Sequence, residues 1–260
     1  MRCPCLPRGY SMHSTLKRTI TMPAILLAAL CGAAYAGENN QITITQDGLS
    51  NSLTVDQSKA SNSIVGGVSL LNGPLLTGSS TSAQLGLNDT AEQKGTGNAA
   101  KLTITNFTED ENHLLFDHGK IGILQDNSTS SAGANDAIVT VNGNGTGLIS
   151  QTGGNNTASL LVTGLGSTGG IYQYGDNNRA GDRSTVGLTV SGNNSSGTIT
   201  QNGSNLVSGL GVTGNGTNVY YTLNGNNVSA LPSTDATGNS AGGVQVISNG
   251  ATVTITQTPF

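Results

Sequence analysis

The chain has no Trp, and only 3% of its residues are aromatic and 9% charged. Ordinary globular proteins carry about 25% charged residues, and large aromatic side chains dominate their cores. This composition therefore excludes a thick core of large side chains. With only 6 Pro in 260 residues, it also lacks the charge and proline that are typical of disordered chains. Gly, Asn, Ser and Thr dominate instead, which favours thin layers of stacked main chain and amide side chains.

The amino-terminal segment, which contains the chain's few cysteines, differs in composition from the rest. Lys17 and Arg18 precede a short apolar run at 25–30, which small residues follow as far as Ala36. This layout predicts a secretory signal peptide over 1–36, with cleavage between Ala36 and Gly37. The run is too short to span a bilayer. We therefore expect a secreted mature chain that is not inserted in a membrane.

All three cysteines lie inside that segment, at Cys3, Cys5 and Cys31. The mature chain would then have neither a disulfide nor a thiolate metal site, although it is exported to an oxidising compartment. Met12 is an alternative start. Cys31 raises a lipoprotein alternative, which the bulky Leu30 before it disfavours.

Basic charge is also concentrated at the amino terminus. The first 36 residues hold four of the 10 basic residues and none of the 14 acidic ones, so the remainder carries a net charge of −8. Nucleic acids and anionic membranes require clustered Lys and Arg. The sequence therefore predicts no nucleic-acid partner.

One spaced pattern, Gln-x-Gly-x-x-Asn, recurs along the chain, and such repeats are interpreted before any other feature. Its full copies are Gln46, Gly48, Asn51; Gln93, Gly95, Asn98; Gln151, Gly153, Asn156; and Gln173, Gly175, Asn178. A weaker copy has Gln57 and Asn62, and a shortened copy has Gln201, Gly203 and Asn205. Gln46 and Gln57 are 11 residues apart, and Gln151 and Gln173 are 22 apart. Eleven residues therefore form one strand and one turn.

Apolar and polar residues alternate before each turn, as at 41–46 and 253–257. No window after residue 36 has a 3.6-residue apolar period, so we expect no helix. The predicted fold is all-β, a β-solenoid with about 22 residues per strand-turn-strand rung. We expect N-terminal repeats over 37–64, a loop or linker over 65–90 and a repeat solenoid over 91–260. Irregular insertions are expected near 106–136 and 229–243.

A stack of such rungs satisfies its own main chain, and identical amides hydrogen-bond along the stacking axis. Gly at the corner supplies the positive φ of a tight turn, and the Asn after it tolerates the same region. The end rungs keep open edges, which recruit another chain unless they are capped. We therefore expect end-to-end polymerisation. Four residues, Asp176, Arg179, Asp182 and Arg183, are candidate charged gatekeepers that slow pairing at one rung.

The pattern resembles the curlin repeat of bacterial curli subunits. Residues 171–175, Ile-Tyr-Gln-Tyr-Gly, are similar to a unit of the major subunit, as are residues 199–203. The resemblance implies an extracellular amyloid fibre subunit at the bacterial cell surface, exported through the periplasm, that contributes to biofilm matrix and cell adhesion. It also implies related fibre subunits and export or nucleation accessory proteins as partners. A bulk subunit, a nucleator and a fibre-associated relative all fit it.

Other functions have weaker support. Gly164 to Gly169 fit G-x-G-x-x-G, but a dinucleotide site needs a strand before this motif and a helix after it. His113, Asp117 and His118 could ligate a metal, although such residues in an acidic loop more often form a solvated surface. We predict no cofactor and no metal.

Three functional alternatives remain. An enzyme of the polysaccharide-cleaving β-helix class would need paired carboxylates in a groove, whereas the acids are scattered, so we predict no enzymatic activity. Alternating Thr residues at 43–45, 198–200 and 252–256 could form an ice- or surface-binding array. The third alternative is a monomeric, capped β-solenoid adhesin.

Overall fold

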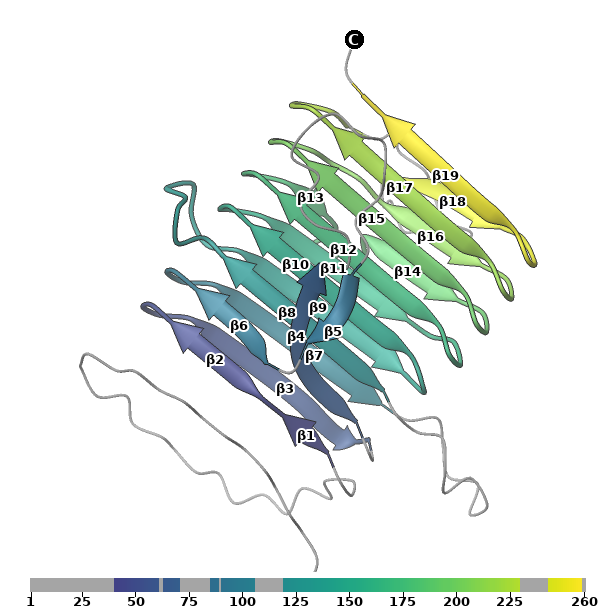
Figure 1. Cartoon of the computed structure of the whole chain (residues 1–260), viewed down its shortest axis with the longest axis horizontal. Helices are drawn as coiled ribbons and strands as arrows, with labels where there is room; N and C mark the ends of the chain where they lie inside the picture. The colour runs from purple at the N-terminus through teal and green to yellow at the C-terminus, as the bar shows by residue number, and fades with distance from the viewer. Residues whose placement is uncertain are drawn as a thin grey trace, which may run out of the picture.

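The structure is a computed structural model, which describes residues 40–60, 63–70, 85–88, 90–105, 119–229 and 243–258. Within these ranges every regular element is a β-strand and none is a helix, which confirms the all-β prediction. The strands form an 11-stranded sheet and an 8-stranded sheet, which we call sheet A and sheet B. They lie as two layers with the strands of each layer side by side (Figure 1).

Sheet A follows the order β1-β4-β8-β10-β12-β15-β17-β19, while β2 pairs with β6, β6 with β8, and β5 with β4. Its strands are β1 (Gln41–Ile42), β2 (Ile44–Asp47), β4 (Ile64–Leu70), β5 (Leu85–Asn88), β6 (Ala91–Lys94), β8 (Lys120–Asp126), β10 (Thr146–Thr152), β12 (Thr168–Tyr174), β15 (Ser196–Asn202), β17 (Asn218–Asn224) and β19 (Thr252–Gln257). All of its pairs are parallel except β4–β5.

Sheet B follows the order β18-β16-β14-β11-β9-β7-β3, and β13 pairs with β11. Its strands are β3 (Ser52–Lys59), β7 (Ala99–Thr105), β9 (Asp136–Asn142), β11 (Thr157–Val162), β13 (Arg179–Ala180), β14 (Leu188–Ser191), β16 (Leu210–Thr213) and β18 (Val244–Ile247). Every named pair in this sheet is parallel.

The chain crosses from sheet A to sheet B and back, so each strand stacks on the strand of the preceding circuit. Ile149 pairs with Ile171 in sheet A, and Leu188 pairs with Leu210 in sheet B. The step between Gln151 and Gln173 is 22 residues, as the repeat predicts. Insertions lengthen other steps, to 28 residues between Gln173 and Gln201 and to 47 residues between Gln46 and Gln93. The same residue types still stack on one another.

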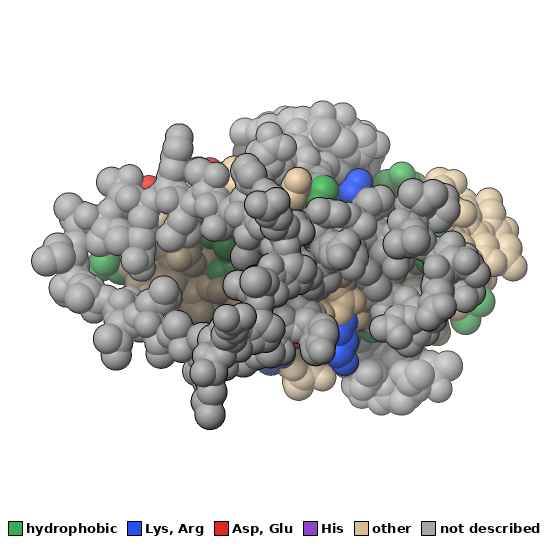
Figure 2. Space-filling view, turned by 90° about the horizontal axis from the view of Figure 1, so that it is seen from below, with side chains coloured by type: hydrophobic (Ala, Val, Ile, Leu, Met, Phe, Trp, Pro, Cys, Tyr) green, Lys and Arg blue, Asp and Glu red, His purple; other side chains and the backbone are tan. Residues whose placement is uncertain are grey.

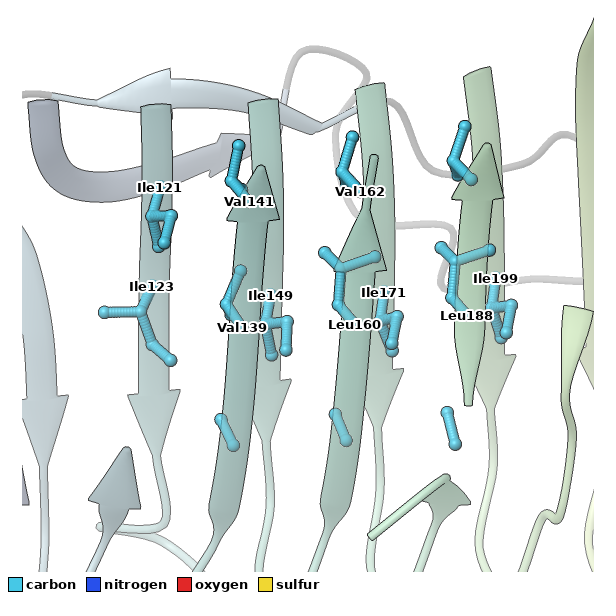
Figure 3. Packing of buried hydrophobic residues seen from close by; sticks show 14 of the residues in the cluster. Ile121, Ile123, Val139, Val141, Ile149, Leu160, Val162, Ile171, Leu188 and Ile199 are labelled. Atoms are coloured by element: carbon cyan, nitrogen blue, oxygen red, sulfur yellow. The ribbon is translucent and has the colours of Figure 1, made fainter. Parts of the chain in front are cut away.

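The core lies between the two sheets as columns of like side chains. Ile123, Ile149, Ile171 and Ile199 of sheet A form one column, each with no exposed surface. Figure 3 shows them facing Val139, Leu160 and Leu188 of sheet B. Period-two alternation of apolar and polar residues places every second side chain inside, so a thin core of aliphatic residues suffices.

Small residues set the spacing of this core. A Cβ on Gly169 would lie 2.5 Å from Leu160 Cδ1 and 2.9 Å from Val162 Cγ2. Gly147 and Gly197 stack with Gly169 in sheet A, and a Cβ on either would also crowd sheet B, with nearest atoms at 2.7 Å and 3.0 Å. A column of glycines therefore makes room for the larger aliphatic residues that face it.

The segment expected to be a loop over 65–90 differs from that expectation in its described part. β4 enters sheet A at Ile64–Gly66 and then pairs antiparallel with β5, from Gly67 to Leu70. A Cβ on Gly122 of β8 would meet Gly67 O and Val68 Cγ2, so this hairpin packs on the outer face of sheet A. Only the first half of β4 therefore pairs with β8, and β6 pairs with the second half of β8. The insertion thus begins within β4.

The other expected insertions are described only in part. Residues 106–118 and 230–242 lie outside the described residues, as do Asn62, Ala36 and Gly37. Within the range 106–136, residues 120–126 form β8, a regular member of sheet A that pairs with both β6 and β10.

Candidate functional site: amide ladders and open sheet edges

A ladder of buried glutamines runs along the inner face of sheet A. In each step the side-chain Nε2 donates to Oε1 of the glutamine in the next strand. The donor–acceptor distances are 2.6 Å for Gln46–Gln93, 2.7 Å for Gln93–Gln125, 2.8 Å for Gln125–Gln151, 2.9 Å for Gln151–Gln173 and 2.7 Å for Gln173–Gln201. From Gln93 to Gln201 the side chains are buried, so nearly all of these bonds are shielded from competing water.

Each amide in the middle of the ladder also holds sheet B. The second hydrogen of Gln151 Nε2 binds the carbonyl of Asp136 at 3.1 Å, and that of Gln173 Nε2 binds the carbonyl of Thr157 at 2.9 Å. A carbonyl oxygen only accepts hydrogen bonds. These contacts therefore fix which side-chain atom of each amide is nitrogen and give the ladder one direction.

A second ladder, of asparagines, lies at the corner between sheets A and B. Asn156 Oδ1 accepts the backbone N–H of Asn178 at 2.9 Å, and Asn156 Nδ2 donates to the carbonyl of Gly175 at 2.9 Å. The same N–H to Oδ1 contact links Asn51 to Asn98, Asn98 to Asn135, Asn135 to Asn156 and Asn178 to Leu206. These side chains replace main-chain partners that a tight corner leaves unsatisfied.

The corner geometry explains the glycine of the repeat. Gly153, Gly175 and Gly203 have φ values of 100°, 109° and 137°, a region that L-residues rarely adopt. A Cβ on Gly175 would lie 2.2 Å from the carbonyl oxygen of Gly203 on the next strand. Gly48 and Gly95 occupy the same kind of corner, so stacking as well as turn conformation requires glycine.

Two of the residues chosen from the sequence have different surroundings from the rest. Gln57 is buried in sheet B, where its Nε2 donates to Ser63 Oγ at 2.8 Å, so it lies outside the glutamine ladder. Asn205 has φ of 58° and bonds Asn227 at the exposed tip of the corner, while Leu206 takes the buried position equivalent to Asn178.

Sequence reasoning did not assign ladder roles to several residues. Gln125 and Asn135 belong to the two ladders, but the turn between them is longer than the repeat unit. Asn40 accepts from Ser63 N and Oγ at the opposite corner. The signal available for Gln125 was the alternating strand before it, Ile121 to Leu124.

The two ends of the stack carry open edges. Among the described strands, β1, β2 and β3 at one end, and β19 and β18 at the other, have a ladder partner on one side only. The register of sheet A, followed from strand to strand, places Ile42, Ile44 and Gln46 in the same columns as Val253, Ile255 and Gln257. Positions 43–46 and 254–257 both read Thr-Ile-Thr-Gln. The two edges of sheet A therefore match residue for residue over these four positions.

Charge is unevenly distributed between these ends. After Arg183 the chain contains a single charged residue, Asp235, so β14 to β19 carry none. The opposite end carries Asp47, Asp56 and Lys59, and hydrogen bonds from Ser58 lower the pKa of Asp56. On the face in Figure 2 the described Lys and Arg side chains lie in isolated spots and not in one patch.

The four candidate gatekeepers lie in the middle of the stack, where they make contacts within the chain. Arg179 pairs with Asp182, and Arg183 Nε lies 2.7 Å from Asp136 Oδ2. Asp176 Oδ1 accepts from Gly154 N at 2.7 Å. Burial alone would raise the pKa of Asp182, but hydrogen bonds from Ser184 and the charge of Arg179 lower it overall. These charges are therefore placed to hold turns and not to protect an end edge.

The threonines considered as a surface array differ in exposure. Thr252, Thr254 and Thr256 of β19 are exposed, whereas Thr200 has no exposed surface. The described part of the chain contains no group of three or more His, Cys, Asp or Glu that could hold a metal ion; the candidates His113, Asp117 and His118 lie outside it. It also contains no helix long and apolar enough to cross a membrane. Comparison with protein-family models, curated proteins and solved structures gives no match.

Proposed function

We propose that the chain is a β-solenoid subunit that assembles end to end into an extracellular, curli-like amyloid fibre. The observation that carries this proposal is the match between the two open edges of sheet A. β19 and β1–β2 hold the same residue types in the same columns, and both edges are unpaired among the described strands. An unpaired edge with alternating apolar residues is a template for another chain, and β19 also carries no charge that would oppose pairing.

The interior of the molecule supports the same proposal, because it already has the stacking that a fibre would extend. Apart from β4–β5, its strands pair in parallel, at the spacing of about 4.8 Å that is typical of cross-β structure. Glutamine and asparagine ladders of this kind stabilise amyloid stacks. Docking of one subunit on the next would repeat the β17–β19 ladder, in which Tyr221 pairs with Ile255 and Leu223 with Gln257.

The biological part of the proposal follows from the resemblance to curlin repeats. Its Gln, Gly and Asn positions are the residues that form the ladders and corners described above. We propose a role in biofilm matrix and cell adhesion, with copies of the chain, related subunits and export or nucleation proteins as partners. Electron microscopy of the cell surface, with and without this chain, tests that role.

Assembly itself is tested with purified residues 37–260. We expect growth of fibres that bind an amyloid dye and diffract with a meridional spacing of about 4.8 Å. A preparation that stays a monodisperse monomer at high concentration contradicts the proposal.

An edge variant makes the test specific. Ile255→Lys places a charge on the inward side of β19, where a docked strand would bury it, so we expect at least about a tenfold slower elongation. Leu165→Lys is the matched control, because Leu165 is 51% exposed in a turn in the middle of the stack. Equal slowing by both variants contradicts docking on β19.

A capped, surface-binding adhesin is the second candidate. It requires covered end strands, and the described residues include no strand or helix over β19. An ice-binding array requires exposed threonines, whereas Thr200 and Thr222 are buried. Thermal hysteresis of the Ile255→Lys variant would support the ice-binding alternative.

A further inference from the structure

The glutamine ladder has a direction, and its column has a glutamine at each end of the stack, Gln46 and Gln257. Gln46 is the first member, and its Nε2 donates inward to Gln93. Gln46 Oε1 has no partner among the described residues, and the side chain is half-buried. The first end of the ladder therefore presents an acceptor at the edge formed by β1 and β2.

The other end is built differently, because the ladder is interrupted. Leu223 of β17 occupies the ladder column between Gln201 and Gln257. Two substitutes compensate for the missing amide. Gln201 Nε2 donates to Leu206 O and Ser208 Oγ, both at 3.0 Å, and the Tyr221 hydroxyl donates to Gln257 Oε1 at 2.5 Å.

Tyr221 is suited to orient Gln257. Its ring has no exposed surface and stands in the column of Ile149, Ile171 and Ile199. Burial raises the pKa of Tyr221 to about 12, so its hydroxyl keeps its proton at neutral pH. Because this hydroxyl holds Oε1 of Gln257 toward the stack, Nε2 of Gln257 is directed to the outer edge of β19. Nε2 of Gln257 has no partner within the described ranges.

We propose that these two ends make assembly polar: β1–β2 of a second copy dock on β19, and Gln257 Nε2 donates to Gln46 Oε1 of that copy. This inference rests on the proposed function and adds to it the register, the polarity and a positioning residue, Tyr221. Only this docking continues the amide ladder. Two C-terminal ends would oppose Nε2 to Nε2, and two N-terminal ends would oppose Oε1 to Oε1, so both symmetric contacts leave amide groups unsatisfied.

Single cysteines test the polarity, because residues 37–260 contain none. Thr43 and Thr254 stand in one outward column of sheet A, so the predicted docking stacks Thr43 of one copy on Thr254 of the next. Adjacent strands are about 4.8 Å apart, a Cα separation that a disulfide or a short bis-thiol reagent can span.

Thr43→Cys and Thr254→Cys proteins are assembled separately and as an equimolar mixture, and then cross-linked. We expect covalent dimers in the mixture, with peptide mapping to a 43–254 link, and none in either protein alone. Fibres whose Thr254→Cys protein cross-links to itself overturn the polarity but leave the proposed function standing. A wild-type protein that does not assemble at all overturns both.

A second pair of variants tests Gln257 directly. Gln257→Glu keeps an acceptor for Tyr221 but replaces the outward donor with a carboxylate, so we expect at least about a tenfold loss of seeded elongation at pH 7. Protonation of the glutamate below about pH 4 supplies a donor and restores most of that loss. Asn194→Asp, at an exposed turn between β14 and β15 and away from both end edges, is the control with the same change in charge. Equal effects of the two variants, or no recovery in acid relative to the control, overturn the assignment.

Tyr221→Phe tests the positioning role, since it keeps the ring and removes only the hydroxyl. We expect the protein to remain folded, while the ratio of 43–254 to 254–254 links falls because the Gln257 amide is free to turn over. A merely structural role for the hydroxyl would lower the unfolding temperature and leave that ratio unchanged.

Discussion

Removing one glutamine from the middle of the ladder is the most direct test of what holds the stack together. Gln173→Leu loses three hydrogen bonds: from Gln151 Nε2 at 2.9 Å, to Gln201 Oε1 at 2.7 Å and to Thr157 O at 2.9 Å. At about 1–1.5 kcal/mol per buried bond the loss is about 3–4.5 kcal/mol. The buried leucine regains about 1 kcal/mol of apolar transfer, so we expect a net destabilisation of about 2–3.5 kcal/mol.

Leu223 occurs naturally in the ladder column, and its surroundings show why leucine at position 173 should be destabilising. There, Ser208 and Tyr221 supply substitute hydrogen bonds. Near Gln173, Ala158 occupies the position equivalent to Ser208, and Ile171 the position equivalent to Tyr221. Neither side chain can supply a hydrogen bond. The neighbouring amides would therefore keep buried groups unsatisfied.

The assay is urea unfolding of the Ile255→Lys protein, which we expect to stay monomeric, with and without Gln173→Leu. Gln245→Leu, at an exposed position, is the control, and we expect it to change the free energy of unfolding by less than about 0.5 kcal/mol. A Gln173→Leu effect no larger than that control would refute the view that the amide ladder is a major source of stability.

Three further predictions concern the glycine column, the corner ladder and the buried tyrosine. Gly169→Val, whose Cβ would lie 2.5 Å from Leu160 Cδ1, should destabilise the fold by at least about 1–3 kcal/mol in the same urea assay, more than Gly211→Val, whose nearest neighbour is 3.6 Å away. Asn156→Ala removes bonds to Asn178 N and Gly175 O and should cost about 1–3 kcal/mol; Asn226→Ala, at an exposed corner, should cost less, and equal costs would contradict a buried ladder. Because burial raises the pKa of Tyr221 to about 12, the folded state holds this proton more tightly than the unfolded state, whose pKa is about 10. This stability is complete below about pH 10 and is lost as the pH rises through about 12; Tyr221→Phe should lessen that loss in thermal denaturation, and an unchanged pH profile would show that Tyr221 does not cause it.

The all-β prediction succeeded because its signals are local. Alternation at 41–46 and the Gln-x-Gly-x-x-Asn spacing are set by strand and turn geometry within a few residues. Gln46, Gln93, Gln151, Gln173 and Gln201 were therefore found from the sequence, and the structure joins them in one ladder.

The remaining features depend on stacking between distant residues, which local spacing does not report. Asn205 was matched to the repeat by its place after Gly203, but Leu206 occupies the buried corner position. Tyr221 and Gln257 meet across 36 residues only because an insertion leaves the register intact. The partial pairing of β4 in sheet A likewise requires knowing where β6 lies.

The short excursion between β13 and β14 leaves the stack and returns to the same place. Gly181 bridges Val186, and Asp182 N donates to Thr185 O at 2.8 Å, so the two ends of the excursion lie beside one another. A foreign peptide spliced between residues 183 and 184 would begin and end at neighbouring points, leaving the layers on either side undisturbed. In a polymer of this protein, each subunit would then expose one copy of the peptide, at a regular interval along the fibre.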